Sequence, residues 1–337
     1  MARHRTTWRA LATALCLLAG MGAAAAQEAL PATASAASSC PPPAASFIPK
    51  DGWAAAARRA TDRGLLWRIE KDGHTSWLYG TIHVARADWM LPGPAVREAL
   101  QHVDAIALEL DLLDKDTDRK PLTAQNTSEE RRLMAGRRDE RFNKLLAAAC
   151  LPDTALTQIR TFQPTMQLAS LAVLGVRTDG LYPDFGIDLF LTTYARSRHL
   201  PIVPLETLAQ QMRVLNEIVP KREVAQQFDT VLDAIESGEA RTQTLTLANA
   251  WAESDLDTLE RYPQWCDCLK TPADKRAFTR LVTHRNLAMA ENIARVHMSG
   301  RRVFGAVGAL HMIGPKGIPA LLAASGFTVT PVIPASH

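Results

Sequence analysis

A repeated motif constrains this sequence more than any other feature. The pattern G-x-x-H occurs at Gly80 to His83 and again at Gly308 to His311, each time after a run that is typical of a buried strand. A helix pattern and a further strand follow both copies, so the order strand, G-x-x-H, helix, strand occurs twice. The sequence therefore predicts an α/β fold whose mixed central sheet is built from two pseudo-equivalent halves, with a mainly helical middle segment.

The glycine of each motif suggests how its histidine is presented. Glycine readily adopts left-handed backbone conformations, so we expect a tight turn that places the histidine just past a strand end. That is the edge where open α/β sheets carry their chemistry. The predicted strands are Leu65 to Glu70, Ser76 to Tyr79, Ala105 to Leu110, Leu200 to Leu205, Arg302 to Val307 and Thr328 to Ile333, and the longest predicted helix is Pro272 to Ser299.

Composition divides the chain into three parts. In residues 1–26, three arginines precede an apolar run from Ala10 to Ala25, which is the pattern of a cleaved signal peptide and is short for a membrane anchor. Residues 27–46 are rich in Ala, Pro and Ser and are predicted to be a flexible tether. Residues 47–337 are predicted to form a single domain with a helical insertion at about 112–300. We expect a periplasmic or secreted protein without membrane insertion after cleavage.

Net charge and cysteine content bear on the partners of the protein and on its compartment. The formal net charge is +3, and removal of the first 26 residues takes away three arginines and no acid, which leaves a charge of about zero. We therefore expect no nucleic-acid partner. Cys40, Cys150, Cys266 and Cys268 form an even set that predicts disulfides in an oxidising compartment, with three possible pairings. The pair Cys266 and Cys268 could instead be a metal or redox site.

Three residues form a candidate metal site. His83, His311 and Glu109 are all placed at or beyond predicted strand ends. Two neutral imidazoles and one carboxylate, with positions left for water and substrate, are typical of a catalytic divalent-metal site. Such a metal lowers the pKa of its bound water and polarises a carbonyl. The alternatives are ordinary hydrogen-bonded histidines and, for Glu109 and the neighbouring Asp111, acids that are simply solvated after the strand has ended.

Four more residues are candidates for catalytic roles. Asp188 and Glu206 start or end elements, where an acid also serves as an ordinary helix-terminal residue. Arg285 could bind an oxyanion or a carboxylate, or form a solvated ion pair on its long helix, and Asn286 lies beside it. The sequence has no phosphate loop, no H-E-x-x-H and no G-x-S-x-G, so it does not indicate a nucleotide hydrolase of that type, a zincin or a serine hydrolase.

Ordered motifs along the chain resemble those of the TraB/GumN family. They are L-Y-G-T-I-H-V, A-I-A-L-E-L-D, G-I-D-L-F with V-P-L-E-T-L-A-Q-Q, H-R-N-L-A-M-A-E-N-I and V-G-A-L-H-M, and they span about Leu65 to Val332. The family includes the animal TIKI proteins, which are regarded as metal-dependent proteases that use both G-x-x-H motifs. The chain departs from the pattern at His284, where an acid is expected, and in the charged segment Asp114 to Arg138.

The resemblance implies a role for each candidate. His83 and His311 match the active-site histidines, and Glu109 matches the acid that accompanies them. The Arg-Asn pair, the G-x-D motif and the L-E-T motif of the family correspond to Arg285 with Asn286, to Asp188 and to Glu206.

These features together predict an exported hydrolase that depends on a divalent metal, Mn, Co or Zn. The predicted reaction is cleavage of a peptide, or of a small ester or amide, by metal-activated water. Arg285 or Asn286 would stabilise the oxyanion, and Glu206 or Asp188 would act as base or orient a ligand. The alternative is a non-catalytic envelope protein that binds haem, a metal or a glycan in the same cleft and acts as an accessory to polysaccharide export.

Overall fold

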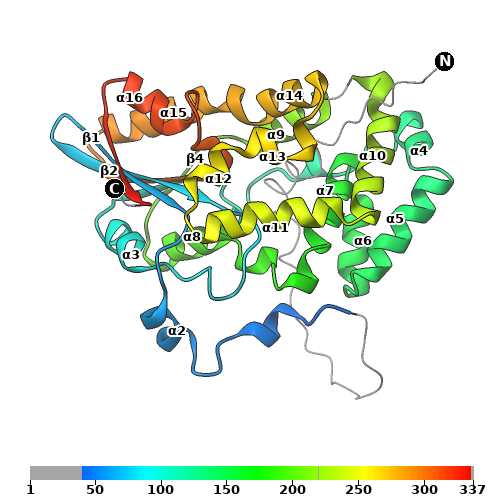
Figure 1. Ribbon diagram of the computed structural model, residues 1–337, viewed down its shortest axis with the longest axis horizontal. Helices are drawn as coiled ribbons and strands as arrows, with labels where there is room; N and C mark the ends of the chain where they lie inside the picture. The colour runs from blue at the N-terminus through cyan, green and yellow to red at the C-terminus, as the bar shows by residue number, and fades with distance from the viewer. Residues whose placement is uncertain (1–39, 219, 335–337) are drawn as a thin grey trace.

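The computed structural model describes residues 40–218 and 220–334 (Figure 1). The predicted signal peptide and residues 27–39 of the predicted tether lie outside these ranges. The strands are β1 (Leu65–Lys71), β2 (His74–Thr81), β3 (Ala105–Leu108), β4 (Ile202–Pro204), β5 (Val303–Gly308) and β6 (Thr328–Ile333). The helices are α2 (Trp53–Arg59), α3 (Pro94–Gln101), α4 (Ser128–Leu133), α5 (Arg137–Ala148), α6 (Asp153–Thr161), α7 (Pro164–Leu174), α8 (Ile187–Ser197), α9 (Leu208–Glu217), α10 (Val224–Glu236), α11 (Glu239–Ala252), α12 (Leu256–Glu260), α13 (Tyr262–Trp265), α14 (Pro272–Phe278), α15 (His284–Met298) and α16 (Ile318–Ala324).

The strands form one mixed sheet in the order β4-β3-β5-β2-β1-β6. Strands β2, β3, β4 and β5 run parallel, whereas β1 runs antiparallel to both β2 and β6. Every residue of β3 and β5 is buried, as expected for parallel strands covered on both faces. Figure 1 shows α15 and α16 on one side of the sheet and α3 and α8 on the other. The predicted mixed α/β fold is confirmed.

Both predicted units are present as crossovers between parallel strands. The first runs from β2 through α3 to β3, and the second from β5 through α16 to β6. Their first strands, β2 and β5, are paired neighbours in the sheet. From β2 the chain crosses past β5 to β3, and from β5 it crosses past β2 and β1 to β6, so the two crossovers run in opposite directions. The two G-x-x-H motifs therefore leave the sheet side by side, which is what their pseudo-equivalence predicts.

The reason we gave for the motif glycines is wrong. Gly80 lies within β2, and Gly308 has φ −49° and ψ 137°, so neither adopts a left-handed conformation. At Gly80 the requirement is space, because a Cβ there would lie 3.3 Å from the Cα of Ala309. The backbones of the two motifs approach each other closely at this point, and Trp251 of α11 donates an indole N–H to the Gly80 carbonyl at 2.7 Å.

The folded part of the chain begins before Phe47, where we had placed its start. Cys40 forms a disulfide with Cys150 across 110 residues, and the Tyr182 hydroxyl donates to the Pro42 carbonyl. These two contacts fasten the segment 40–46 to the domain. The prediction of a flexible tether is therefore wrong for residues 40–46, because the disulfide to Cys150, just after α5, fixes a segment whose composition is typical of a loop.

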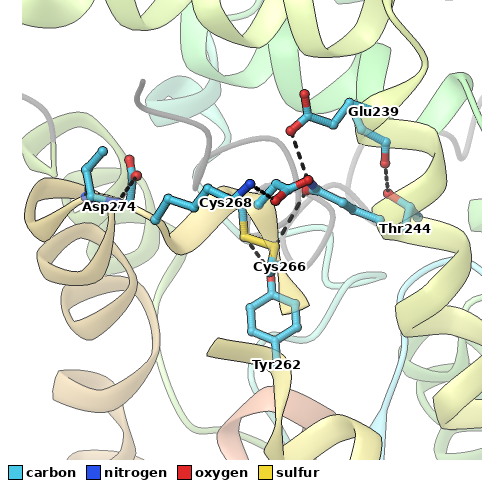
Figure 2. The surroundings of a disulfide bond; sticks show 11 residues. Glu239, Thr244, Tyr262, Cys266, Cys268 and Asp274 are labelled. Carbon is cyan, nitrogen blue, oxygen red and sulfur yellow. Dashed lines mark hydrogen bonds and ion pairs between the residues drawn. A yellow bond between two sulfur atoms is a disulfide. The ribbon is translucent and has the colours of Figure 1, made fainter. Parts of the chain in front are cut away.

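The second disulfide joins Cys266 to Cys268, two residues apart and both buried (Figure 2). Tyr262 lies beneath it, and its hydroxyl donates to the Cys268 sulfur at 3.2 Å, because a disulfide sulfur carries no proton. The two disulfides select one of the three pairings that the sequence left open. They also show the C-x-C motif as a disulfide in this structure.

The long helix predicted at Pro272 to Ser299 is interrupted. It consists of α14, a π-helical turn at Thr279–Thr283 and α15, and it leads into β5 as expected. π-Turns inside α-helices are frequent at functional sites, and Arg285 lies two residues after the end of this one. Among the described residues, no helix has the length and apolar character that a membrane span requires.

Candidate functional site

The candidate site lies where the four parallel strands end. Strands β3 and β4 are neighbours, and their pairing continues past the strands through a hydrogen bond from the Glu206 amide to the Glu109 carbonyl at 3.1 Å. Their two carboxylates are thereby set side by side. On the other side of β3, the β5 partner of Leu108 is Ala306, and two residues further on the Gly308 amide donates to Glu109 Oε1 at 2.9 Å.

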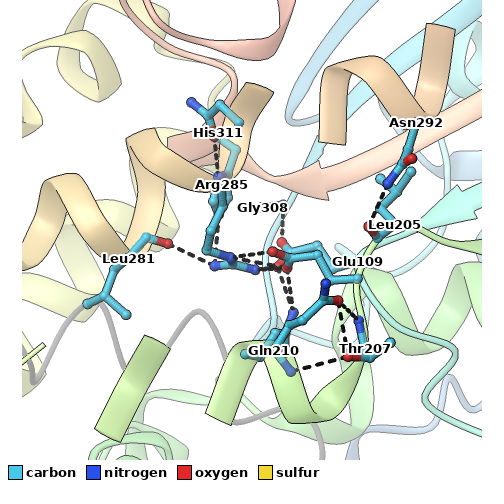
Figure 3. Close-up of polar contacts among 12 residues, drawn as sticks. Glu109, Leu205, Thr207, Gln210, Leu281, Arg285, Asn292, Gly308 and His311 are labelled. Carbon is cyan, nitrogen blue, oxygen red and sulfur yellow. Dashed lines mark hydrogen bonds and ion pairs between the residues drawn. The ribbon is translucent and has the colours of Figure 1, made fainter. Parts of the chain in front are cut away.

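Arg285, from the first turn of α15, forms ion pairs with both carboxylates, and Figure 3 shows its guanidinium directed toward Glu109. Its Nη2 donates to Glu109 Oε2 at 2.6 Å, and its Nε donates to Glu206 at 2.9 and 3.1 Å. Its Nη1 donates to the Leu281 carbonyl in the π-turn at 2.8 Å and lies 3.4 Å from His311 Nε2. Every nitrogen of the guanidinium therefore has a protein partner in this arrangement.

His83 is held by an acid from α8. Its Nδ1 lies 2.7 Å from Asp188 Oδ2, and the Thr81 hydroxyl donates to Asp188 Oδ1 at 2.8 Å. The start of α8 can reach this position because Gly186 lacks a side chain, since a Cβ there would lie 2.5 Å from the His83 carbonyl oxygen. The other ring nitrogen of His83, Nε2, is buried and has no hydrogen-bond partner among the described residues.

His311 is held in the corresponding way from α15. Its Nδ1 lies 2.6 Å from Asn286 Oδ1, and because an amide oxygen only accepts, the proton is on Nδ1 of the imidazole. The amide nitrogen of Asn286 donates to the Lys316 carbonyl at 2.7 Å, which fixes the orientation of the amide. His311 Nε2 therefore carries a lone pair that points into the site.

Burial and charge set the protonation of these groups. Burial of Glu109 opposes its ionisation and is the largest single effect, but Arg285, the two histidines and the Gly308 amide together outweigh it and lower the pKa of Glu109 to about 2. Burial of His311 lowers its pKa to about 3, so the imidazole is neutral. Burial disfavours a charged His83 as well, but the Asp188 carboxylate outweighs it and raises the pKa of His83. The site thus contains one neutral and one more basic imidazole.

The donor set matches a metal ion only in part. Both imidazoles are fixed through Nδ1 by an oxygen, which is the arrangement usually seen for histidines that bind a metal through Nε2. Both oxygens of Glu109, in contrast, already accept hydrogen bonds from Arg285 and Gly308. In residues 40–218 and 220–334, no three His, Cys, Asp or Glu side chains are grouped closely enough to hold a metal ion.

All seven predicted site residues line this one region. His83, His311, Glu109, Asp188, Arg285 and Asn286 are buried, and the side chain of Glu206 is 10% exposed. Asp111 does not belong to it, because β3 ends at Leu108 and the Asp111 carboxylate pairs instead with Arg196 of α8 at 3.0 Å.

Two residues of the site were not predicted individually. Thr81 binds Asp188, and Gln211 of α9 donates from Nε2 to both Glu109 and Glu206 at 3.2 Å. Both lie inside motifs that were recognised, G-T-I-H and L-E-T-L-A-Q-Q. The spacing of Gln211 from Leu208 and Leu215 on one helical face could have placed it toward the interior.

The fold and the site together define a mixed α/β protein with a buried histidine and carboxylate centre at the carboxyl ends of its parallel strands. Residues 65–331 match the model of the TraB/PrgY/gumN family, and the chain belongs to this family. It is similar to the uncharacterized protein YbaP of Escherichia coli (strain K12) and to that of Shigella flexneri. Each is 27% identical over 274 residues, which cover 76% of this chain and 96% of the relative. No solved structure matches the chain.

Proposed function

We propose that this protein is an exported hydrolase that depends on a divalent metal and cleaves amide or ester bonds, with peptides as the first substrate class. The observation that carries the proposal is the pair of imidazoles at the ends of β2 and β5. Each is fixed through Nδ1, by Asp188 or by Asn286, and directs Nε2 away from that contact. The two disulfides support an exported location, because such bonds persist in oxidising compartments.

His83 and His311 would hold the metal, Mn, Co or Zn, through Nε2. Glu109 remains the predicted carboxylate ligand, and it would have to exchange its contact with Arg285 for the metal. A divalent ion bound there supplies Lewis-acid activation of water and of the substrate carbonyl. The buried surroundings strengthen every electrostatic interaction with charge that develops during the reaction.

The contacts of the other residues refine the roles that the sequence suggested. Asp188 and Asn286 position the two histidines, and one of the two N–H groups of the Asn286 amide donates to the Lys316 carbonyl. Arg285 forms ion pairs with Glu109 and Glu206 and holds both in place, so its first role is to organise the carboxylates. His83, whose basicity Asp188 supports, is the group best suited to accept a proton when no metal occupies its Nε2.

Metal titration of the purified protein tests the proposal. Mn, Co and Zn would be offered in turn to the wild type, to His83→Ala and to His311→Ala, with calorimetric detection of binding. His102→Ala is the matched control, because His102 is exposed and belongs to α3's end. We expect stoichiometric binding by the wild type and the control, and loss of binding in both site variants.

A screen with peptide and ester substrates follows on the metal-loaded protein. Turnover that is removed by a chelator and restored by the metal supports hydrolysis. If the folded wild type binds none of the three metals, the proposed mechanism is refuted. A Soret band on haem titration that His83→Ala abolishes would instead support the non-catalytic binding protein that the sequence left as an alternative.

A further inference from the structure

A cationic pocket lies outside the candidate site. Its volume is about 650 Å³, and its walls come from α2, from the segment that follows His83 and from the turn at 177–180. It includes none of the seven predicted site residues. Pro42, Phe47 and Leu91 supply apolar wall, and the charged side chains of the lining are Arg59, Arg63, Arg86, Arg177, Asp88 and Asp179.

The positive charges of this pocket are not balanced. Asp179 is already bound by Arg241 of α11, whose Nε donates to it at 2.7 Å, so Asp179 is neutralised from outside the lining. Arg59 forms its own exposed ion pair with Asp51 at 2.6 Å. The remaining charged side chains of the lining are Arg63, Arg86, Arg177 and Asp88. Asp88 forms an ion pair with only one of these arginines, Arg63, at 3.4 Å.

Those three arginines are held by aromatic rings more than by carboxylates. The guanidinium carbons of Arg63 and Arg86 lie 5.8 and 5.0 Å from the ring centroid of Trp89, so two like charges share one ring. Arg177 is buried, lies 5.3 Å from the Tyr182 ring centroid and donates from Nη1 to a backbone carbonyl. Among the described residues, no carboxylate forms an ion pair with Arg86 or Arg177, and Nε of Arg63 is buried without a hydrogen-bond partner.

We propose that this pocket binds an organic anion whose carboxylate or phosphate group contacts Arg63, Arg86 and Arg177 and whose apolar body packs against Phe47 and Leu91. Guanidinium groups bind planar anions through paired hydrogen bonds, and an anion relieves the repulsion between neighbouring arginines. The volume lies within the range of small-molecule sites, which combine apolar walls with a few convergent polar groups.

The apolar wall is fixed in place before any ligand binds. The Cys40–Cys150 disulfide anchors the segment that carries Pro42 and Phe47, and the Phe47 ring lies 5.3 Å from that of Tyr182. A preformed wall lowers the ordering cost of binding. The proposal does not rest on the proposed hydrolase activity, because the pocket and the histidine site use different residues.

Calorimetric titration with defined probes tests the proposal. The probes are decanoate, decyl phosphate, decanol and inorganic phosphate, so that the head group and the apolar body are separated and the two anion classes are compared. We expect saturable binding of decanoate or decyl phosphate, and binding at least about 10-fold weaker for decanol and inorganic phosphate, since each lacks one half of the interaction.

Two variants assign the binding to the pocket. Arg86→Gln should weaken binding of the anionic amphiphile by about 10-fold or more, because a charge-assisted hydrogen bond is lost. Arg59→Gln is the matched control, since Arg59 lines the same pocket but is exposed and paired, and we expect a change below about 2-fold. If thermal melting shows that Arg86→Gln is unfolded, Arg63→Gln takes its place.

Several results would overturn the proposal. They are no saturable binding of either amphiphile, equal affinity for decanol and decanoate, and equal effects of the Arg59 and pocket-arginine variants. Metal titration is a separate experiment on other residues, so failure of this inference and failure of the proposed hydrolase are distinguishable.

Discussion

Glu109→Gln tests whether Arg285 holds a buried carboxylate ionised. The pKa of Glu109 is lowered from 4.5 to about 2, which corresponds to about 3 kcal/mol in favour of the charged folded state. Because the folded-state pKa is lowered, this stabilisation is fully present above pH 4.5 and is lost as the pH falls toward 2. Treating glutamine as equivalent to protonated glutamate, we expect a free energy of unfolding lower by about 3 kcal/mol at pH 7 and by about 2 kcal/mol at pH 3.5.

Urea unfolding followed by circular dichroism, with a chelator present, measures both differences. Glu140→Gln is the control, because Glu140 is exposed on α5, and it should change stability by less than about 0.5 kcal/mol at either pH. A Glu109→Gln deficit that is the same at both pH values would refute the reasoning. So would a deficit no larger than that of the control at pH 7.

Three further changes test other parts of the structure. Arg285→Met removes the cation that binds the buried Glu109 and the neighbouring Glu206 and should cost about 3–5 kcal/mol at pH 7, a deficit that shrinks at pH 5 as the pKa of Glu109 rises; urea unfolding that shows no pH dependence would contradict this. Gly186→Ala should cost about 1–3 kcal/mol and lower the melting temperature, because its Cβ would overlap the His83 carbonyl; an unchanged melting curve argues against that close contact. Joint Cys40→Ser and Cys150→Ser substitution should cost about 4–5 kcal/mol by urea unfolding, since it opens a loop of 110 residues, whereas a loss below about 1 kcal/mol would not fit loop closure.

The sequence was most informative about the strands and about the site residues at the strand ends. Alternating and continuous apolar runs predicted the six strands and the long helix before β5, because burial of a strand or a helix face leaves a regular pattern. The equivalence of the two G-x-x-H motifs predicted that His83 and His311 would come together, and β2 and β5 are indeed paired. Local sequence could also locate Glu109 at the end of β3.

Interactions between distant residues could not be predicted in this way. Nothing local to Arg285 indicates that its partners are Glu109 and Glu206, since they are 176 and 79 residues away in the sequence. The close approach at Gly80 likewise depends on the backbone of a second motif. Asp111 illustrates the converse error, because the predicted strand ran to Leu110 whereas β3 ends at Leu108, and the Asp111 carboxylate pairs with Arg196 instead.

The two halves of the site are alike in geometry and different in charge. Both histidines are held through Nδ1 by an oxygen from a helix, but the oxygen belongs to a carboxylate at His83 and to an amide at His311. A carboxylate stabilises an imidazolium at His83, whereas burial, with the guanidinium of Arg285 beside it, lowers the pKa of His311 and leaves it neutral. The repeated motif therefore supplies equivalent positions, and the helix partners make them unequal. The inequality extends to the ring nitrogens that face the site, because Nε2 of His311 accepts from Nη1 of Arg285 at 3.4 Å, whereas Nε2 of His83 has no hydrogen-bond partner among the described residues.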